Sequence, residues 1–106
     1  SGGSCIYTDS PGSSVTVKFD GISISLVTRL GLAVGKIKVT VDSGTPFMID
    51  CYSATPEYQQ ILAIADPLSE GVHIVKLECA GTSNPASGGV GIYIDAFAIT
   101  GKVLSL

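Results

Sequence analysis

Tryptophan is absent from this 106-residue sequence, and aromatic residues of all kinds make up only 7% of it. Charged residues are also few, at 14%, whereas hydrophobic residues reach 45% and the mean hydropathy is +0.48. No apolar run approaches the roughly 18 residues that a membrane-spanning helix needs, so membrane insertion is not expected. The length predicts one domain, with much of the apolar content in strands that are buried on one face.

Positive charge is scarce as well. The chain carries six basic and nine acidic residues, which gives a net charge of −3 and a pI of about 4.7. The basic residues form no stripe and have no aromatic residues interleaved with them. A nucleic-acid partner is therefore not expected.

Cysteine occurs three times, without the spacing of a disulfide framework or a zinc site. Cys51 and Cys79 each lie in an alternating apolar run, where a small buried side chain is expected. Free thiols favour folding in a reducing cytosol, even for a protein that works outside the cell.

Catalytic motifs are equally scarce. The single histidine, His73, lies in the middle of a predicted strand, where a structural role is expected. The carboxylates form no close pair suited to acid–base work on a glycosidic bond, and no glycine-rich phosphate loop leads from a strand into a helix. We predict that the chain is not an enzyme. A hydrolase, the competing hypothesis, requires His73 to be exposed in a cleft beside a serine or an acid.

Several aspartates have expected structural roles. Asp9, Asp20 and Asp95 could meet at a structural calcium site, because hard cations prefer carboxylate and carbonyl oxygens, although no motif spacing supports it. No other cofactor or metal site is expected. Asp50 and Asp95 are predicted to anchor loops by accepting hydrogen bonds from backbone N–H groups.

Alternation of apolar and polar residues indicates strands along most of the chain. Roughly seven or eight short strands, with a turn about every 8–12 residues, predict an all-β antiparallel β-sandwich over residues 5–106. Asp20-Gly21 and Asp42-Ser43-Gly44 are predicted turns, and residues 1–4 (Ser-Gly-Gly-Ser) are interpreted as a disordered cloning remnant. The expected core residues are Val15, Val17, Phe19, Val75, Leu77, Cys79, Ile92, Ile94 and Phe97.

Residues 55–66 fit two structures. Thr55-Pro56-Glu57 is typical of a helix start, with a hydroxyl cap, proline at the first position and an acid in the first turn. Every neighbouring segment, however, has a period of two. The local pattern leans towards a helix with one apolar face, which would carry Tyr58, Ile61, Leu62 and Ala65 and place Tyr58 in the core.

Aromatic and amide side chains gather in this region and suit a sugar ligand. Sugars stack their C–H faces on aromatic rings, and their hydroxyls pair with amides and charged groups. The candidate ligand-binding residues are Tyr52, Asn84, Arg29 and Gln59, with Tyr58 and Gln60 beside them.

The segment Leu30-Gly31-Leu32-Ala33-Val34-Gly35 is apolar and has no usable period, so a loop is expected. An exposed apolar loop is suited to a protein contact. Leu30, Leu32 and Val34 are therefore the candidate protein interface, which would hold the chain in an oligomer.

Several stretches follow one another in a distinctive order: 15–21 (VTVKFDG), 35–44 (GKIKVTVDSG), 50–62 (DCYSATPEYQQIL), 71–77 (GVHIVKL), 81–87 (GTSNPAS) and 94–97 (IDAF). This order resembles galactose-binding-like jelly-roll carbohydrate-binding modules, which are found in bacterial glycoside hydrolases and in phage virion proteins. The resemblance implies a jelly roll with a glycan as ligand. It also implies a strand at residues 58–65, which overrules the helix.

Two hypotheses of different classes follow. The first is a non-catalytic carbohydrate-binding (glycan adhesion) module of a surface enzyme or a phage virion protein. The alternative is a structural or oligomerisation domain of a tail or capsid-associated virion protein, without sugar binding. Both predict an extracellular or virion-surface location, after folding in the host cytosol in the phage case.

Overall fold

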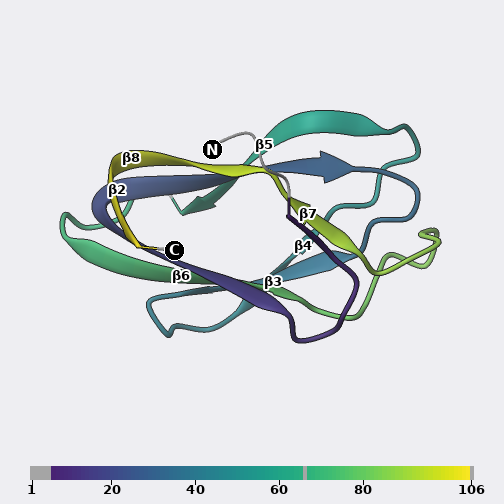
Figure 1. Ribbon diagram of the computed structural model, residues 1–106, viewed down its shortest axis with the longest axis horizontal. Coiled ribbons are helices and arrows are strands. Elements are labelled where there is room, and N and C mark those ends of the chain that lie inside the picture. The colour runs from purple at the N-terminus through teal and green to yellow at the C-terminus, as the bar shows by residue number, and fades with distance from the viewer. Residues whose placement is uncertain (1–5, 66, 106) are drawn as a thin grey trace.

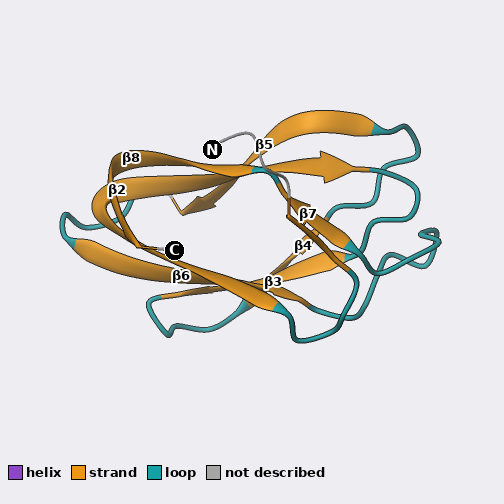
Figure 2. Ribbon diagram, viewed as in Figure 1, coloured by secondary structure: helices purple, strands orange, loops and turns teal. Residues whose placement is uncertain are grey.

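The computed structural model describes residues 6–65 and 67–105, so the interpretation of residues 1–4 lies outside the described residues. Within them the chain consists of strands and loops (Figure 2). No described helix is long and apolar enough to cross a membrane. The strands are β1 (Ile6–Thr8), β2 (Ser14–Leu30), β3 (Lys36–Val41), β4 (Phe47–Asp50), β5 (Glu57–Ala65), β6 (Val72–Cys79), β7 (Ile92–Ile94) and β8 (Ala96–Ser105).

The paired strands are antiparallel and build a sandwich, which confirms the predicted fold class. One layer contains β4, β3, β6 and the first half of β2. The second half of β2 continues into the opposite layer, where it lies between β5 and β8. Figure 1 shows β2 running along β6, bending back and returning along β8. A separate two-stranded ribbon joins β1 to β7.

The pairing of β2 with β6 ends at Asp20, and its register with β8 shifts after Gly21, where the sequence predicts a turn. That prediction is wrong, because β2 is continuous from Ser14 to Leu30. Gly21 faces Gly101 of β8, and a Cβ on Gly21 would overlap the carbonyl oxygen of Thr100. The glycine therefore permits a close approach of two backbones, beside an irregularity in the register.

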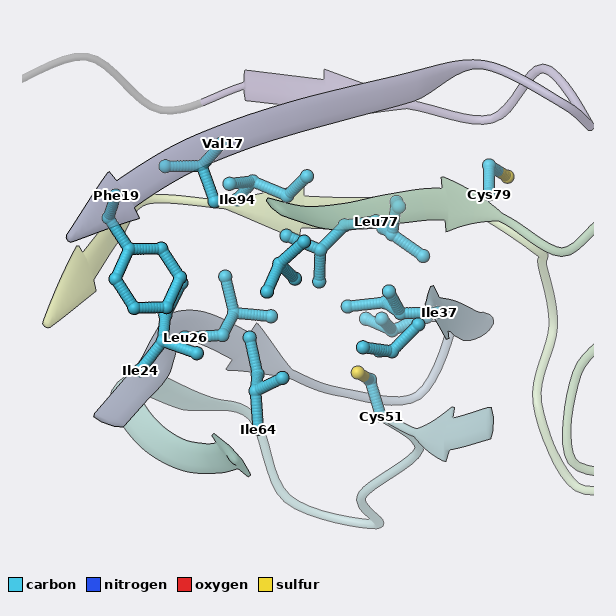
Figure 3. Close-up of a cluster of buried hydrophobic side chains, with 14 residues drawn as sticks. Val17, Phe19, Ile24, Leu26, Ile37, Cys51, Ile64, Leu77, Cys79 and Ile94 are labelled. Carbon is cyan, nitrogen blue, oxygen red and sulfur yellow. The ribbon is translucent and has the colours of Figure 1, made fainter. Parts of the chain in front are cut away.

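The core lies between the two layers and contains 14 buried apolar side chains among the residues that the structure describes (Figure 3). The expected core is confirmed, with Val15 and Phe97 packed at its margin and only partly buried. Cys51 and Cys79 are buried free thiols, as predicted, and burial raises the pKa of Cys51 to about 12. The buried apolar residues are Val17, Phe19, Ile24, Leu26, Val34, Ile37, Val39, Cys51, Ile64, Val75, Leu77, Cys79, Ile92 and Ile94.

Residues 57–65 form a strand, as the family resemblance implies, and the helix favoured by the local pattern is wrong. The second half of β2 supplies the reason, because its backbone needs an antiparallel partner on the side opposite β8. From Gln60 to Ile64 the side chains alternate, and Ile64 enters the core. Tyr58 is not in the core, since 65% of its surface is exposed.

Candidate functional site

An open groove of about 340 Å³ lies beside the ends of β2 and β5 and the ribbon of β1 and β7. This volume is at the lower end of the range of small-molecule pockets, which is about 300–1,000 Å³. Three of the four tyrosines of the chain line the groove, together with its single arginine and an apolar segment (residues 30–34). The lining residues are Tyr7, Arg29, Leu30, Gly31, Leu32, Ala33, Val34, Pro56, Tyr58 and Tyr93.

A β-bulge places Tyr58 next to Arg29. Thr28 pairs with Gln60 and Leu30 pairs with Glu57, so Tyr58 and Gln59 together stand opposite the single residue Arg29. Gln59 has a φ of 54°, and the side-chain amide of Gln60 donates to the carbonyl oxygen of Tyr58 at 3.1 Å. Bulges of this kind redirect side chains, and this one lets both Tyr58 and Arg29 line the groove.

The guanidinium of Arg29 lies over two tyrosine rings. Its central carbon is 5.6 Å from the ring centroid of Tyr58 and 5.1 Å from that of Tyr93, which are cation–π distances. Tyr93 is held near β2 by the buried hydroxyl of Thr28, which donates to the Tyr93 carbonyl oxygen at 2.6 Å. Tyr58 of β5 and Tyr93 of β7 therefore both lie against the cationic side chain of Arg29, which belongs to β2.

Asp95 lies next to Arg29 but is not among the residues that line the groove. The Nε atom of Arg29 is 3.7 Å from Oδ1 of Asp95, and this oxygen is buried without a hydrogen-bond partner among the described residues. The backbone N–H of Asp95 donates to the carbonyl oxygen of Val27, so the residue marks the point where the chain passes from β7 into β8. The expected backbone N–H partner is therefore missing at Oδ1, where an arginine lies nearby instead.

Tyr7 completes the aromatic part of the groove. Its ring centroid lies 4.8 Å from that of Tyr93, with the rings tilted by 47°, because the two residues face each other across β1 and β7. Partial desolvation, followed by the charge of Asp9, raises the pKa of Tyr7. Gly91 makes room for the Tyr7 ring, since a Cβ at this position would overlap the ring and its hydroxyl.

The apolar segment is fixed by backbone hydrogen bonds from a second loop. Gly88 donates its N–H to the carbonyl oxygen of Leu32 at 2.8 Å, and the hydroxyl of Ser87 donates to that of Val34 at 2.9 Å. Val34 belongs to the core, and Leu30 packs partly buried against it. Of the three candidate interface residues, Leu32 is the one with an exposed side chain, at 53%.

Tyr52 and Asn84 come together at a separate cluster around Asp50. The Asp50 carboxylate accepts the backbone N–H of Tyr52 and the side-chain amide of Asn84, each at 3.0 Å, and these bonds lower its pKa. This agrees with the anchoring role expected of Asp50. Residues 51 and 53 are in turn hydrogen-bonded to Gly31, so the cluster supports the apolar segment from outside the groove.

The structure therefore divides the predicted ligand-binding residues. Arg29 lies in the groove, whereas Tyr52 and Asn84 flank Asp50 and Gln59 is exposed on the bulge. Tyr7 and Tyr93 were not among the predicted residues. A signal for Tyr93 is nonetheless present, because in Ile92-Tyr93-Ile94 the two isoleucines point into the core and the tyrosine must point out.

His73 is 7% exposed and has both ring nitrogens engaged. Nδ1 lies 2.5 Å from Oδ2 of Asp42, and Nε2 lies 2.6 Å from the carbonyl oxygen of Ser69. Because both neighbours are acceptors, the ring has to donate from both nitrogens, which is the imidazolium form. Neither nitrogen is left to act as a base in a cleft.

A calcium site at Asp9, Asp20 and Asp95 has no support in the geometry. In the part of the chain that the structure describes, no three or more His, Cys, Asp or Glu side chains gather as metal ligands would. Binding of a structural calcium ion thus stays a prediction without an identified site.

No protein-family model matches the sequence, and no curated protein matches it. Solved structures do match the fold. A two-domain esterase active on acetylated mannans, co-crystallised with mannopentaose, matches with a TM-score of 0.72 and 16% identity, over 91% of this chain and 28% of that one. A family two carbohydrate esterase from Clostridium thermocellum in complex with cellohexaose matches with a TM-score of 0.65 and 24% identity, over 93% and 28%.

A third match is a family 2 carbohydrate esterase plus carbohydrate-binding domain from Corynascus thermopiles (Myceliophthora fergusii). Its TM-score is 0.60, with 18% identity over 94% of this chain and 28% of that one. At identities of 16–24%, the similarity to these solved structures establishes the fold alone. The chain spans a little over a quarter of the length of each of these carbohydrate esterases.

Proposed function

We propose that this chain is a non-catalytic carbohydrate-binding module and that its ligand occupies the groove between Tyr58 and Tyr93. The observation that carries the proposal is the convergence of three tyrosines and Arg29 beside an apolar segment, with Asp95 lying 3.7 Å from Arg29. Tyr52, Asn84 and Gln59 are proposed to contribute from the margin of the site.

The groups in the groove match the two kinds of surface that a sugar presents. Tyrosine rings accept the C–H face of a pyranose ring, and tyrosine hydroxyls exchange hydrogen bonds with its hydroxyls. Arg29 adds hydrogen-bond donors and the tyrosine hydroxyl oxygens add acceptors, so the groove can both donate to and accept from a sugar hydroxyl.

The structural neighbours support a carbohydrate setting, because they are esterases solved with oligosaccharides or with a carbohydrate-binding domain. Each is about three and a half times the length of the matched region. We infer that this chain acts outside the cell beside a catalytic domain, and the neighbours favour this surface-enzyme setting over the phage virion setting.

A retention assay on immobilised glycans tests the proposal. The wild-type domain should bind a defined set of glycans, and Tyr58→Ala should weaken that binding by about tenfold because a stacking ring is lost. Ile61→Ala is the matched control, since Ile61 lies on the same strand and is 67% exposed but does not line the groove. Equal effects of the two substitutions, or no glycan binding by the wild type, would contradict the proposal.

The exposed side chain of Leu32 favours one further candidate, an oligomerisation domain of a virion assembly. This alternative predicts a dimer or trimer by light scattering that Leu32→Asp dissociates. A monomer that binds glycan excludes it.

A further inference from the structure

Arg29 has hydrogen-bond donors that the described part of the protein does not use. Its Nε atom faces Asp95 at 3.7 Å, and the guanidinium makes no hydrogen bond to a protein acceptor within the described residues. The terminal N–H groups form a planar fork suited to an acceptor oxygen. A ligand with an acceptor oxygen would therefore satisfy the unused donors of Arg29 in the groove.

The charge balance of the groove favours a neutral acceptor over an anion. Asp95 compensates the positive charge of Arg29, and the chain as a whole carries a net charge of −3. A carboxylate would gain attraction from Arg29 but would be repelled by Asp95, whose Oδ1 lies 3.7 Å from the Nε atom of Arg29. A carbonyl oxygen accepts from the guanidinium without that repulsion.

The apolar segment adds a second requirement. Leu32 and Ala33 are exposed beside the groove, and Leu30 and Val34 line it from more buried positions. Sugar hydroxyls gain nothing from these alkyl groups, whereas a methyl group buried against them is removed from water. A ligand that satisfies the whole groove has a carbonyl and a methyl group a short distance apart.

We propose that the groove recognises an acetylated sugar, with the acetyl carbonyl oxygen bound by Arg29 and the acetyl methyl group packed on Leu32. This inference rests on the proposed glycan-binding function and narrows its ligand. The acetyl group occurs as an ester on hydroxyls and as an amide on amino sugars. Both forms carry the same two recognition elements.

Calorimetric titration of the full 106-residue chain distinguishes acetyl esters from acetamido groups as the recognised ligand. The probes are an O-acetylated glucomannan, the same polymer after alkaline deacetylation, tri-N-acetylchitotriose and polygalacturonate. We expect the acetylated polymer to bind at least about tenfold more tightly than its deacetylated form, since one methyl group in an apolar pocket discriminates to this degree. Binding of the chitotriose at similar strength would extend the site to acetamido groups.

Two variants assign the effect to the groove. Leu32→Ala should lower the ratio of acetylated to deacetylated affinity, and Arg29→Gln should weaken acetylated binding by about tenfold. Ile61→Ala, equally exposed but outside the groove, should leave the ratio unchanged. Thermal unfolding and light scattering of each variant separate these effects from misfolding or self-association.

The outcomes separate the two proposals. Equal binding of acetylated and deacetylated polymer, with both weakened in Tyr58→Ala, overturns acetyl recognition and leaves glycan binding intact. Preferred binding of polygalacturonate also overturns it, because Arg29 would then recognise a carboxylate. Absence of binding to any glycan overturns both.

Discussion

Gly91 influences the groove by lacking a side chain. The ring of Tyr7 occupies the space that a Cβ at Gly91 would take, so the orientation of Tyr7 depends on this glycine. Gly88, on the same loop, has open space instead, and its nearest neighbour to an added Cβ is the carbonyl oxygen of Leu32 at 3.9 Å. These two glycines therefore provide a matched pair.

Gly91→Ala is expected to displace the Tyr7 ring, weaken glycan binding by about tenfold and destabilise the fold by about 1–3 kcal/mol. Gly88→Ala is expected to change neither property measurably. Affinity by calorimetry and stability by urea unfolding measure the two effects separately. If Gly91→Ala binds like the wild type, Tyr7 is not part of the site.

The pair formed by His73 and Asp42 makes stability depend on pH. The Ser69 carbonyl oxygen, and then the Asp42 carboxylate, raise the pKa of His73 above its ordinary value of 6.5. Desolvation opposes ionisation of Asp42, but the backbone N–H of Ile74 and the His73 ring together outweigh it and lower its pKa below 3.8. Both shifts favour the ion pair in the folded state.

The raised pKa of His73 and the lowered pKa of Asp42 together define a pH window of maximum stability. The His73 contribution is fully present below pH 6.5 and is lost as the pH rises through the raised folded pKa. The Asp42 contribution is present above pH 3.8 and is lost as the pH falls through the lowered folded pKa. Urea midpoints should thus be highest between these values and fall on the alkaline side.

His73 is the only histidine, so the alkaline decline identifies it. In Asp42→Asn the decline above pH 6.5 should become smaller, because the acceptor that favours the imidazolium has lost its charge. An unchanged decline in that variant would mean that another group is responsible.

Residue types alone could predict part of the site. Arg29 and the tyrosines suggest sugar binding from the sequence, but their grouping depends on register. Tyr58 fits the core on a helical face and becomes a groove residue because the bulge at Gln59 turns it outward opposite Arg29. A bulge adds one residue to a strand, and period-two patterns do not reveal it.

At the scale of the elements, β2 determines how the sandwich is built. Its first half belongs to one layer and its second half to the other, so one continuous strand connects the two layers of the sandwich. The sequence predicts two strands and a turn here, because Asp-Gly between alternating segments is a strong turn signal. The close contact of Gly21 with the backbone near Gly101 is a tertiary feature that local sequence does not encode.

Gly21→Ala should therefore destabilise the fold by about 3 kcal/mol, since the added methyl meets backbone atoms that cannot rotate away. Gly88→Ala again serves as the control. Chemical denaturation measures the difference. A stability within about 0.5 kcal/mol of the wild type would show that β2 and β8 separate at little cost.

At the scale of the whole molecule, the buried core is the part that sequence predicts best. Alternation along 14–19 and 71–79 marks the inward residues correctly because burial on one face imposes a period of two. The groove depends instead on the meeting of four strands and two loops that are distant in sequence. Long-range pairing of this kind follows from the fold and not from any one segment.

The fold also relates this chain to larger proteins. Carbohydrate esterases contain a domain of the same architecture within chains that are more than three times as long. In the proposed function, a sandwich of this kind binds a polysaccharide in the groove at its margin and needs no catalytic residue of its own.

The most direct test of glycan binding in the groove uses the single arginine of the chain. Its side-chain Nε–H group gives one assignable NMR signal that reports on the groove. Titration with any glycan that calorimetry shows to bind should shift this signal saturably, in step with the ring protons of Tyr58 and Tyr93. Binding that leaves all three signals unchanged would contradict glycan binding in the groove, because the glycan would then occupy another surface.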